Sequence, residues 1–176
     1  PYNTYRNKSE ALKNSKKAIK ETKCDAVKVE GGTRVKEIVK HLVKNKIPVL
    51  GHIGITPQTA KGKFRSKGKN ESEIRKLLKD AQDLEQSGAF GIVLECIYSD
   101  ISKQITNAIN IPTIGIGASV NCDGQVLVTD DLIGLNETKF RFVKKFGNIK
   151  KDIKSAVIKY KNSVKQKKFP SKKNSY

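Results

Sequence analysis

Apolar positions along the chain follow two different periods. A spacing of three to four residues predicts helices, and short continuous apolar runs between them predict strands. The expected helices cover residues 9–22, 33–43, 73–87 and 100–109, with a further helical region from 142 to 164. The expected strands cover residues 26–29, 47–53, 91–96, 112–117 and 125–129. Ser9 and Thr33 are expected to cap the first two helices, and Gly88 to end the third.

Strands that alternate with helices in this way indicate a parallel sheet with right-handed crossovers. Two architectures remain open. A doubly wound sheet of five strands suits a chain of 176 residues, whereas a (β/α)8 barrel needs eight strands and about 250 residues. A barrel would therefore require about three more strands before Pro1.

Composition argues against several classes of protein. The three cysteines form no Cys-x-x-Cys pair, which argues against a disulfide scaffold or a zinc knuckle and favours a reducing cytosol. No apolar run reaches the roughly 18 residues of a membrane span, and the first residues are too polar for a secretory signal. The chain contains no Met and begins at Pro1, so it is expected to start inside a longer protein.

The formal net charge of +19 directs attention to nucleic acids. Residues 139–176 hold 14 basic side chains and one acidic one, so most of the excess lies in this stretch. Lysines outnumber arginines 31 to 5, although arginine is the better reader of bases and phosphates. A solvated basic surface is therefore the favoured interpretation, and residues 167–176 are expected to be a disordered basic tail.

Polar residues occupy the ends of three successive expected strands, where α/β proteins gather their functional groups. Lys28 and Glu30 belong to the first strand, His52 to the second and Glu95 to the third. A buried ammonium needs a partner, so Lys28 is either functional or held by Glu30 two residues on. Glu95 suits a general base, with a structural ion pair as the alternative. His52 fits a ligand-binding group and a core histidine equally well.

Three further features carry weaker signals. The glycine-rich residues 115–119 could cradle a phosphate or form a tight turn. Asp130 and Asp131 could ligate a metal, but they fit better as a cap of the turn before Gly134. The Lys- and Gly-rich loop of residues 56–70 is long for an α/β connection, so it is expected to be mobile or functional.

Five segments, in this order, resemble the ketopantoate hydroxymethyltransferases, which are 3-methyl-2-oxobutanoate hydroxymethyltransferases of pantothenate biosynthesis. The segments are VKVEGG at 27–32, GHIGITPQ at 51–58, LEC at 94–96, IPTIGIGA at 111–118 and DGQVLV at 123–128. The resemblance runs from about Pro1 to Tyr160. The order and the intervals of five motifs make it specific, although no single motif would.

The resemblance implies a (β/α)8 TIM barrel, of which this chain covers about the last five βα units, with a partial catalytic domain at residues 1–166. It implies transfer of a hydroxymethyl group from 5,10-methylenetetrahydrofolate to 3-methyl-2-oxobutanoate. The product would be 2-dehydropantoate, formed through an enolate that Mg²⁺ stabilises. It also implies a cytoplasmic homo-decamer whose partners are the keto acid and the folate, rather than nucleic acid or a membrane.

By motif position, the resemblance makes Glu95 the catalytic proton acceptor and makes Lys28 and His52 substrate-binding residues. Glu30 would lie by the metal, through a water. The direct aspartate ligands of the family, and a serine that holds the substrate, would lie before Pro1. The 176-residue chain alone is therefore expected to be inactive.

Two other functions remain possible interpretations of the sequence. Another TIM-barrel enzyme, either phosphate-binding or a keto-acid lyase, would be favoured by binding of a phosphate ester at residues 115–118. A basic nucleic-acid-binding protein that uses residues 139–176 would bind with a steep dependence on salt.

Overall fold

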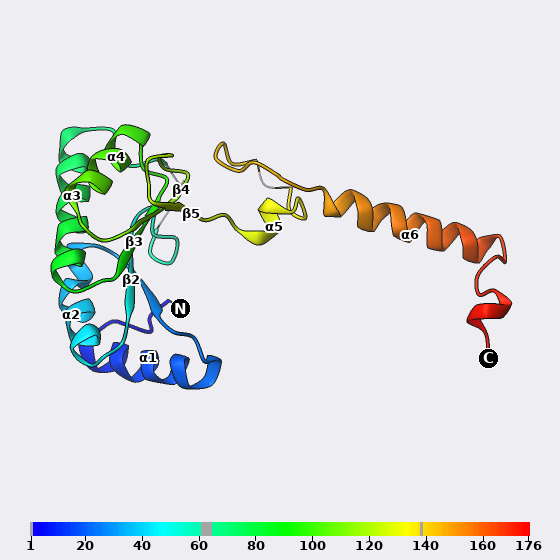
Figure 1. Ribbon diagram of the computed structural model, residues 1–176, viewed down its shortest axis with the longest axis horizontal. Coiled ribbons are helices and arrows are strands. Elements are labelled where there is room, and N and C mark those ends of the chain that lie inside the picture. Colours follow the sequence, from blue (N-terminus) through cyan, green and yellow to red (C-terminus); the bar gives the residue numbers. More distant parts are fainter. Residues whose placement is uncertain (1, 61–64, 138) are drawn as a thin grey trace. The chain divides into compact units, whose positions relative to one another are not determined.

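The computed structural model describes residues 2–60, 65–137 and 139–176 (Figure 1). Part of the long loop expected at residues 56–70 therefore lies outside the described residues. Contacts between residues divide the chain into two compact units, Pro1–Val126 and Leu127–Tyr176.

The first unit is built on a parallel sheet. Its strands are β1 (Val27–Glu30), β2 (Val49–Gly54), β3 (Gly91–Glu95), β4 (Thr113–Ile116) and β5 (Gly124–Gln125). Each strand pairs with the one before it in the sequence, in the order β1-β2-β3-β4-β5. A doubly wound sheet reverses its strand order at a switch point, whereas the strands of a (β/α) barrel follow one another. The order therefore has barrel topology, and the doubly wound alternative is excluded.

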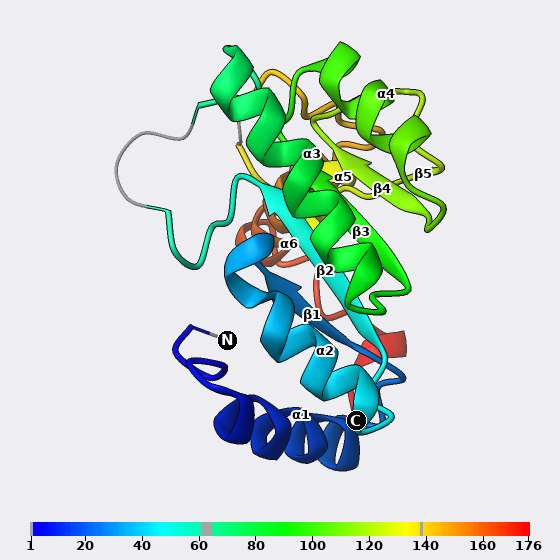
Figure 2. The ribbon, with the colours of Figure 1, turned by 90° about the vertical axis from the view of Figure 1, so that its left-hand side faces the viewer.

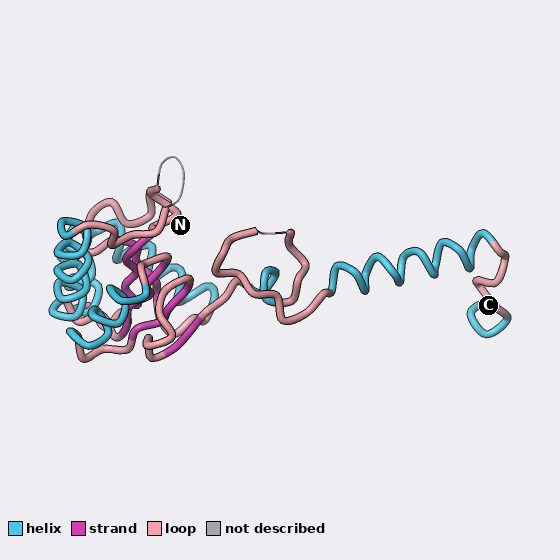
Figure 3. The backbone as a smooth tube through the Cα atoms, turned by 90° about the horizontal axis from the view of Figure 1, so that it is seen from above, coloured by secondary structure: helices cyan, strands magenta, loops and turns pink. Residues whose placement is uncertain are grey.

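Helices cover one side of this sheet. They are α1 (Lys8–Thr22), the short 3-10 helix η1 (Thr33–Val35), α2 (Lys36–Lys44), α3 (Glu71–Gln86) and α4 (Ser99–Ala108). Figure 2 shows α2, α3 and α4 in front of the strands. From above, a group of helices lies along one side of the strands (Figure 3). Strands and helices thus form two layers, as they do in the wall of a barrel.

The core lies between these two layers. Ile53, Ile92 and Leu94 point toward the helices and are buried. Leu84 of α3 packs where Gly51 has no side chain, because a Cβ at Gly51 would approach Leu84 Cδ1 to 2.8 Å. Since side chains alternate along a strand, the residues between these positions point to the other face of the sheet.

Two of the three expected helix caps are wrong. The first helix begins earlier than expected, because the side chain of Asn7, not Ser9, accepts the hydrogen bond from Glu10 N at 2.9 Å. Thr33 lies inside η1, and its backbone N–H donates to Asp80 Oδ1 of α3 at 2.8 Å. Gly88 ends α3 as expected, with φ +88 and its N–H donating to the Glu85 carbonyl.

The fifth strand is shorter than expected. β5 holds only two residues, and the backbone then leaves the sheet after Val126 N donates to the Gly115 carbonyl. The connection from β4 to β5, residues 117–123, contains no helix. It is held instead by Asp123, whose Oδ2 accepts hydrogen bonds from Thr113 N at 2.8 Å and Thr113 Oγ1 at 2.9 Å.

The second unit contains α5 (Thr129–Leu132), α6 (Ile149–Lys165) and the 3-10 helix η2 (Lys172–Asn174). The helix expected around Phe142 is wrong. The N–H groups of Phe146 and Gly147 donate to the Leu132 carbonyl, so they cannot join a helical ladder. The predicted division at residue 167 stays a prediction. None of the helices in the described part of the chain is long and apolar enough to cross a membrane.

Candidate active site

Strand register brings the polar strand ends onto one face. Glu30 pairs with His52, and Gly54 pairs with Glu95. Residues that pair directly in a parallel sheet point the same way, and this set alternates with the residues that face the helices. The side chains of Glu30, His52 and Glu95 therefore lie on the sheet face opposite the helices. That face is the interior of a (β/α) barrel.

His52 lies between the two carboxylates. Its Nδ1 is 3.7 Å from Glu30 Oε1, and its Nε2 is 3.1 Å from Glu95 Oε2. The exposed fractions of the side chains are 1% for His52, 3% for Glu30 and 20% for Glu95, so Glu95 is the member that a ligand can reach. Neither ring nitrogen has a hydrogen-bond partner of good geometry among the described residues. Buried polar atoms left in this state are uncommon and call for an explanation such as a functional role or a bound water.

The loop after β2 fixes Glu30. Gln58 N donates to Glu30 Oε2 at 3.0 Å. Tyr5 also lies beside Glu30, and the pKa of the Tyr5 hydroxyl is raised, first by burial and then by the negative charge of Glu30. Neither contact was predicted from the sequence. Only the position of Gln58 inside the GHIGITPQ segment gave a signal.

A glycine fixes the position of Glu95. Gly54 has φ +98, and a Cβ there would lie 2.1 Å from the Glu95 carbonyl oxygen. This close approach allows Ile55 N to donate to that carbonyl at 2.9 Å. The glycines that flank His52 therefore admit protein atoms, Leu84 at Gly51 and the Glu95 backbone at Gly54.

Cys96 follows Glu95 in the left-handed region, with φ 51. Burial, with the charge of Glu95 as a second cause, raises the pKa of the Cys96 thiol. The thiol therefore stays protonated at neutral pH and is a poor nucleophile there.

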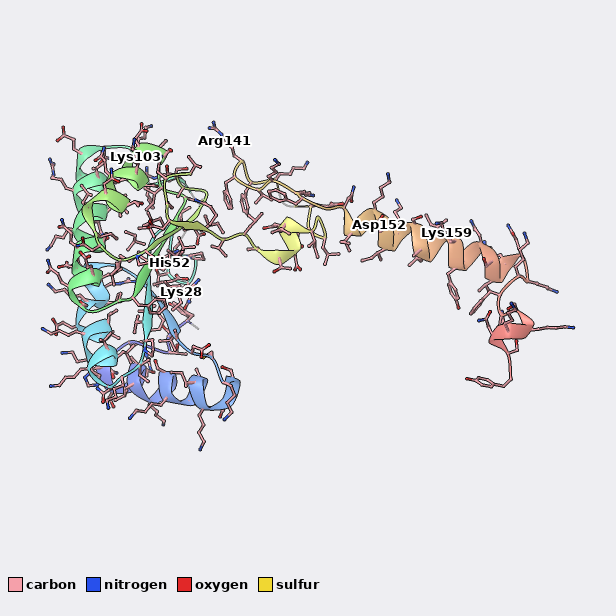
Figure 4. The ribbon with its side chains drawn as sticks, viewed as in Figure 1. Lys28, His52, Lys103, Arg141, Asp152 and Lys159 are labelled. Carbon is pink, nitrogen blue, oxygen red and sulfur yellow. The ribbon has the colours of Figure 1, made fainter. Side chains whose placement is uncertain are left out.

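Lys28 lies on the same face as Glu30, two residues earlier in β1. It pairs with Leu50 in the sheet and its side chain is exposed. Figure 4 shows Lys28 and His52 on neighbouring strands. Within the described residues Lys28 forms no ion pair, so the alternative of a structural salt bridge to Glu30 is not observed.

The glycine-rich residues 115–119 form a closed turn. Ser119 is buried, and its Oγ accepts hydrogen bonds from Ser99 Oγ and Asn121 N. Gln125 Nε2 donates to the Ser119 carbonyl at 2.8 Å. A Cβ at Gly115 would lie 2.8 Å from the Gln125 side chain, so the open side of the turn is filled. These contacts fit the tight-turn interpretation.

The described residues offer few ligands to a metal. Across the described residues, no group of three or more His, Cys, Asp and Glu side chains is placed to hold one. The Asp123 carboxylate accepts hydrogen bonds from Thr113, and these bonds lower the pKa of Asp123. Asp131, inside α5, accepts a hydrogen bond from Asn136 Nδ2 at 3.3 Å. The single carboxylate of Glu30, which the resemblance places by the metal, fits a contact to Mg²⁺ through a water, because this ion usually keeps several waters.

Parallel strands in barrel order, with two carboxylates, an imidazole and an ammonium on the interior face, define a (β/α)-barrel enzyme. The sequence matches the ketopantoate hydroxymethyltransferase family over residues 1–172. The chain belongs to this family.

Three relatives, each named 3-methyl-2-oxobutanoate hydroxymethyltransferase, show the extent of the match. The Pelagibacter ubique protein is 58% identical over 176 residues, which cover all of this chain and 68% of the relative. The Clostridium botulinum strain 657 protein is 49% identical over 95% of this chain and 62% of its own length. The Aliarcobacter butzleri protein is 45% identical, covering all of this chain and 66% of the relative. The chain thus spans about two thirds of the length of these relatives.

One solved structure shows the level of structural likeness. A chloride-inhibited dihydrodipicolinate synthase from Acinetobacter baumannii, complexed with pyruvate, superposes with a TM-score of 0.48 at 14% sequence identity. The superposition covers 75% of this chain and 53% of that chain. A likeness at this level has no bearing on function.

Proposed function

We propose that this chain carries the proton-transfer face of a hydroxymethyltransferase. The reaction moves a one-carbon unit from 5,10-methylenetetrahydrofolate to 3-methyl-2-oxobutanoate and gives 2-dehydropantoate. One observation carries the proposal: Glu30, His52 and Glu95 meet on the interior face of the sheet, in a chain that belongs to the ketopantoate hydroxymethyltransferase family.

Glu95 is the proton acceptor. The substrate carbon next to the ketone is a weak acid, so a base must be held against it. Glu95 is the most exposed of the three side chains, and His52 Nε2 lies 3.1 Å from its Oε2. The proton of the substrate C3 passes to Glu95, and C3 then forms a bond to the one-carbon unit. Both bonds from that carbon to the donor nitrogens break, water supplies the hydroxyl oxygen, and tetrahydrofolate leaves with the proton from Glu95 and one proton from the water.

Lys28 and His52 bind the keto acid. The ammonium of Lys28 is exposed on the face that carries Glu95. A positive charge beside the substrate oxygens stabilises the negative charge that develops on them as the proton leaves. His52, 1% exposed, forms the floor of the site between the two carboxylates.

Mg²⁺ is the proposed cofactor. When bound, it would act as a Lewis acid that stabilises the enolate. Glu30 would contact it through a water, with Gln58 N holding the carboxylate in place. The described residues provide no set of direct ligands. We also propose, by membership of the family, that the whole protein works as a cytoplasmic homo-decamer.

Product formation tests the proposal. The part of the Pelagibacter ubique relative that this chain does not match is joined to the chain, and the chimera is given both substrates and Mg²⁺. We expect 2-dehydropantoate from the chimera and none from its Glu95→Gln variant. Glu71→Gln, on the exposed first turn of α3, is the matched control. A Glu95→Gln chimera as active as the control would refute the role of Glu95.

A further inference from the structure

A cleft of about 510 Å³ opens beside the ends of β1 and β2, toward the helices. Its walls come from the turn after β1, from the residues after β2 and from the first half of α3. Gly54 borders it and pairs with Glu95 in the sheet, so the cleft adjoins the ends of the strands that carry the candidate active site.

Charged side chains line this cleft. Four are cationic and two are acidic: Arg34, Arg65, Lys67, Lys76, Glu73 and Asp80. Glu73 is satisfied, because it pairs with Arg65 at 2.5 Å and accepts hydrogen bonds from the N–H groups of Gly68 and Lys69.

Asp80 is satisfied in the same way. It pairs with Lys76 one turn earlier in α3, and it accepts a hydrogen bond from Thr33 N at 2.8 Å. Its carboxylate sits in the space left by Gly32, where a Cβ would lie 2.0 Å from Asp80 Cγ. The two acids of the cleft are therefore neutralised by two of its four cations.

Arg34 and Lys67 remain. Neither forms an ion pair within the described parts of the chain. The Arg34 guanidinium lies over Gly31, with Nη2 3.5 Å from the place of a Cβ. Lys67 is fixed by its backbone, which donates to the Cys96 carbonyl at 2.9 Å and accepts from Tyr98 N at 3.0 Å. The cleft thus presents two uncompensated positive charges.

Two hydroxyls complete the lining. Thr56 and Thr59 both border the cleft, and their Oγ1 atoms lie 2.9 Å apart. Thr59 Oγ1 also donates to the Thr56 carbonyl at 3.5 Å, so the two hydroxyls are engaged with each other and with the backbone. The charged donors of the cleft, guanidinium and ammonium, are groups that bind carboxylates and phosphates.

We propose that this cleft binds a doubly charged oxyanion, either a pair of carboxylates or a phosphate. Two sources share this chemistry: the glutamate end of the folate donor, and free phosphate. The first source rests on the proposed function, and the second does not.

The test is a calorimetric titration of the 176-residue chain with phosphate, glutarate, folate and pteroate. Pteroate is folate without its glutamate. The variants are Arg34→Gln and Lys67→Gln, and circular dichroism confirms that each one folds. Lys103→Gln is the matched control, since Lys103 is exposed on α4 and outside the cleft (Figure 4).

We expect saturable binding of phosphate or glutarate that weakens by about tenfold in each cleft variant, which is the effect of losing one charge-assisted hydrogen bond. Lys103→Gln should bind as the unmodified chain does. No saturable binding, or equal weakening in all three variants, would overturn the proposal.

The folate arm separates the two sources. If folate binds more tightly than pteroate, and Arg34→Gln removes the difference, the cleft holds the glutamate end of the donor. If phosphate binds and folate has no advantage over pteroate, the cleft is a site for a free oxyanion. Exchange of the substrate C3 proton, which needs no donor, reports on the proposed function independently of either result.

Discussion

Gly54→Ala tests how the fold holds the candidate base. Gly54 has φ +98, where an alanine is strained, and the new Cβ would meet the Glu95 carbonyl oxygen at 2.1 Å. The only relief is to move the β2 end away from Glu95. The hydrogen bond from Ile55 N to the Glu95 carbonyl, 2.9 Å long, would then be lost.

The loss of stability in Gly54→Ala follows from the backbone strain and from the broken hydrogen bond. Backbone strain in a region that glycine alone enters freely is about 1–3 kcal/mol, and an unmade buried hydrogen bond is about 1–3 kcal/mol. We expect the free energy of unfolding to fall by about 3 kcal/mol. With a urea slope of about 1–3 kcal/mol per M, the unfolding midpoint moves down by about 1–3 M.

Urea unfolding followed by circular dichroism measures this shift, and hydrogen exchange of the Ile55 amide measures the lost bond. Gly124→Ala is the control, because its Cβ meets only the flexible tip of Ile114, at 2.9 Å. We expect a small change there. A Gly54→Ala chain that unfolds at the same urea concentration as the unmodified chain, with the Ile55 amide still protected, would refute this reasoning.

Three further predictions concern charge, reactivity and completeness. Hydrogen bonds from Thr113 lower the pKa of Asp123 in the folded chain. Their contribution to stability is therefore complete above the unfolded pKa of about 3.9 and is lost as pH falls through the lowered value. In urea unfolding, Asp123→Asn should reduce the loss of stability that occurs at acid pH. An unchanged loss in this variant would contradict the role of Asp123. Cys96 should react with iodoacetamide with a midpoint pH above that of free cysteine, because burial raises the pKa of its thiol; a midpoint at or below it would contradict this. The purified 176-residue chain should form no 2-dehydropantoate, because its described residues hold no metal-ligand set; turnover would show that the set is not needed.

Much of the site follows from the sequence. Glu30, His52 and Glu95 end successive apolar strands, and parallel strands place their carboxyl ends together. The strand order was not predictable from periodicity, because a barrel and a doubly wound sheet share the same local pattern. Pairing of each strand with its predecessor decided it.

Contacts between distant segments explain what the sequence pattern missed. The pattern predicted Thr33 as a helix cap, but its backbone N–H donates a hydrogen bond to Asp80, 47 residues later. The charge balance of the cleft depends on Arg34 of η1 and on Lys67, which lies 33 residues later between β2 and α3, and only the fold places both in the lining. Local propensity does not encode such contacts.

The most direct measurement of the central claim is exchange of the C3 proton of 3-methyl-2-oxobutanoate in D₂O, with Mg²⁺ and without a folate donor. It isolates the proton transfer assigned to Glu95. We predict exchange in the chimera and in its Glu71→Gln variant, with none above background in Glu95→Gln. Equal exchange rates in Glu95→Gln and Glu71→Gln would show that another group takes the proton.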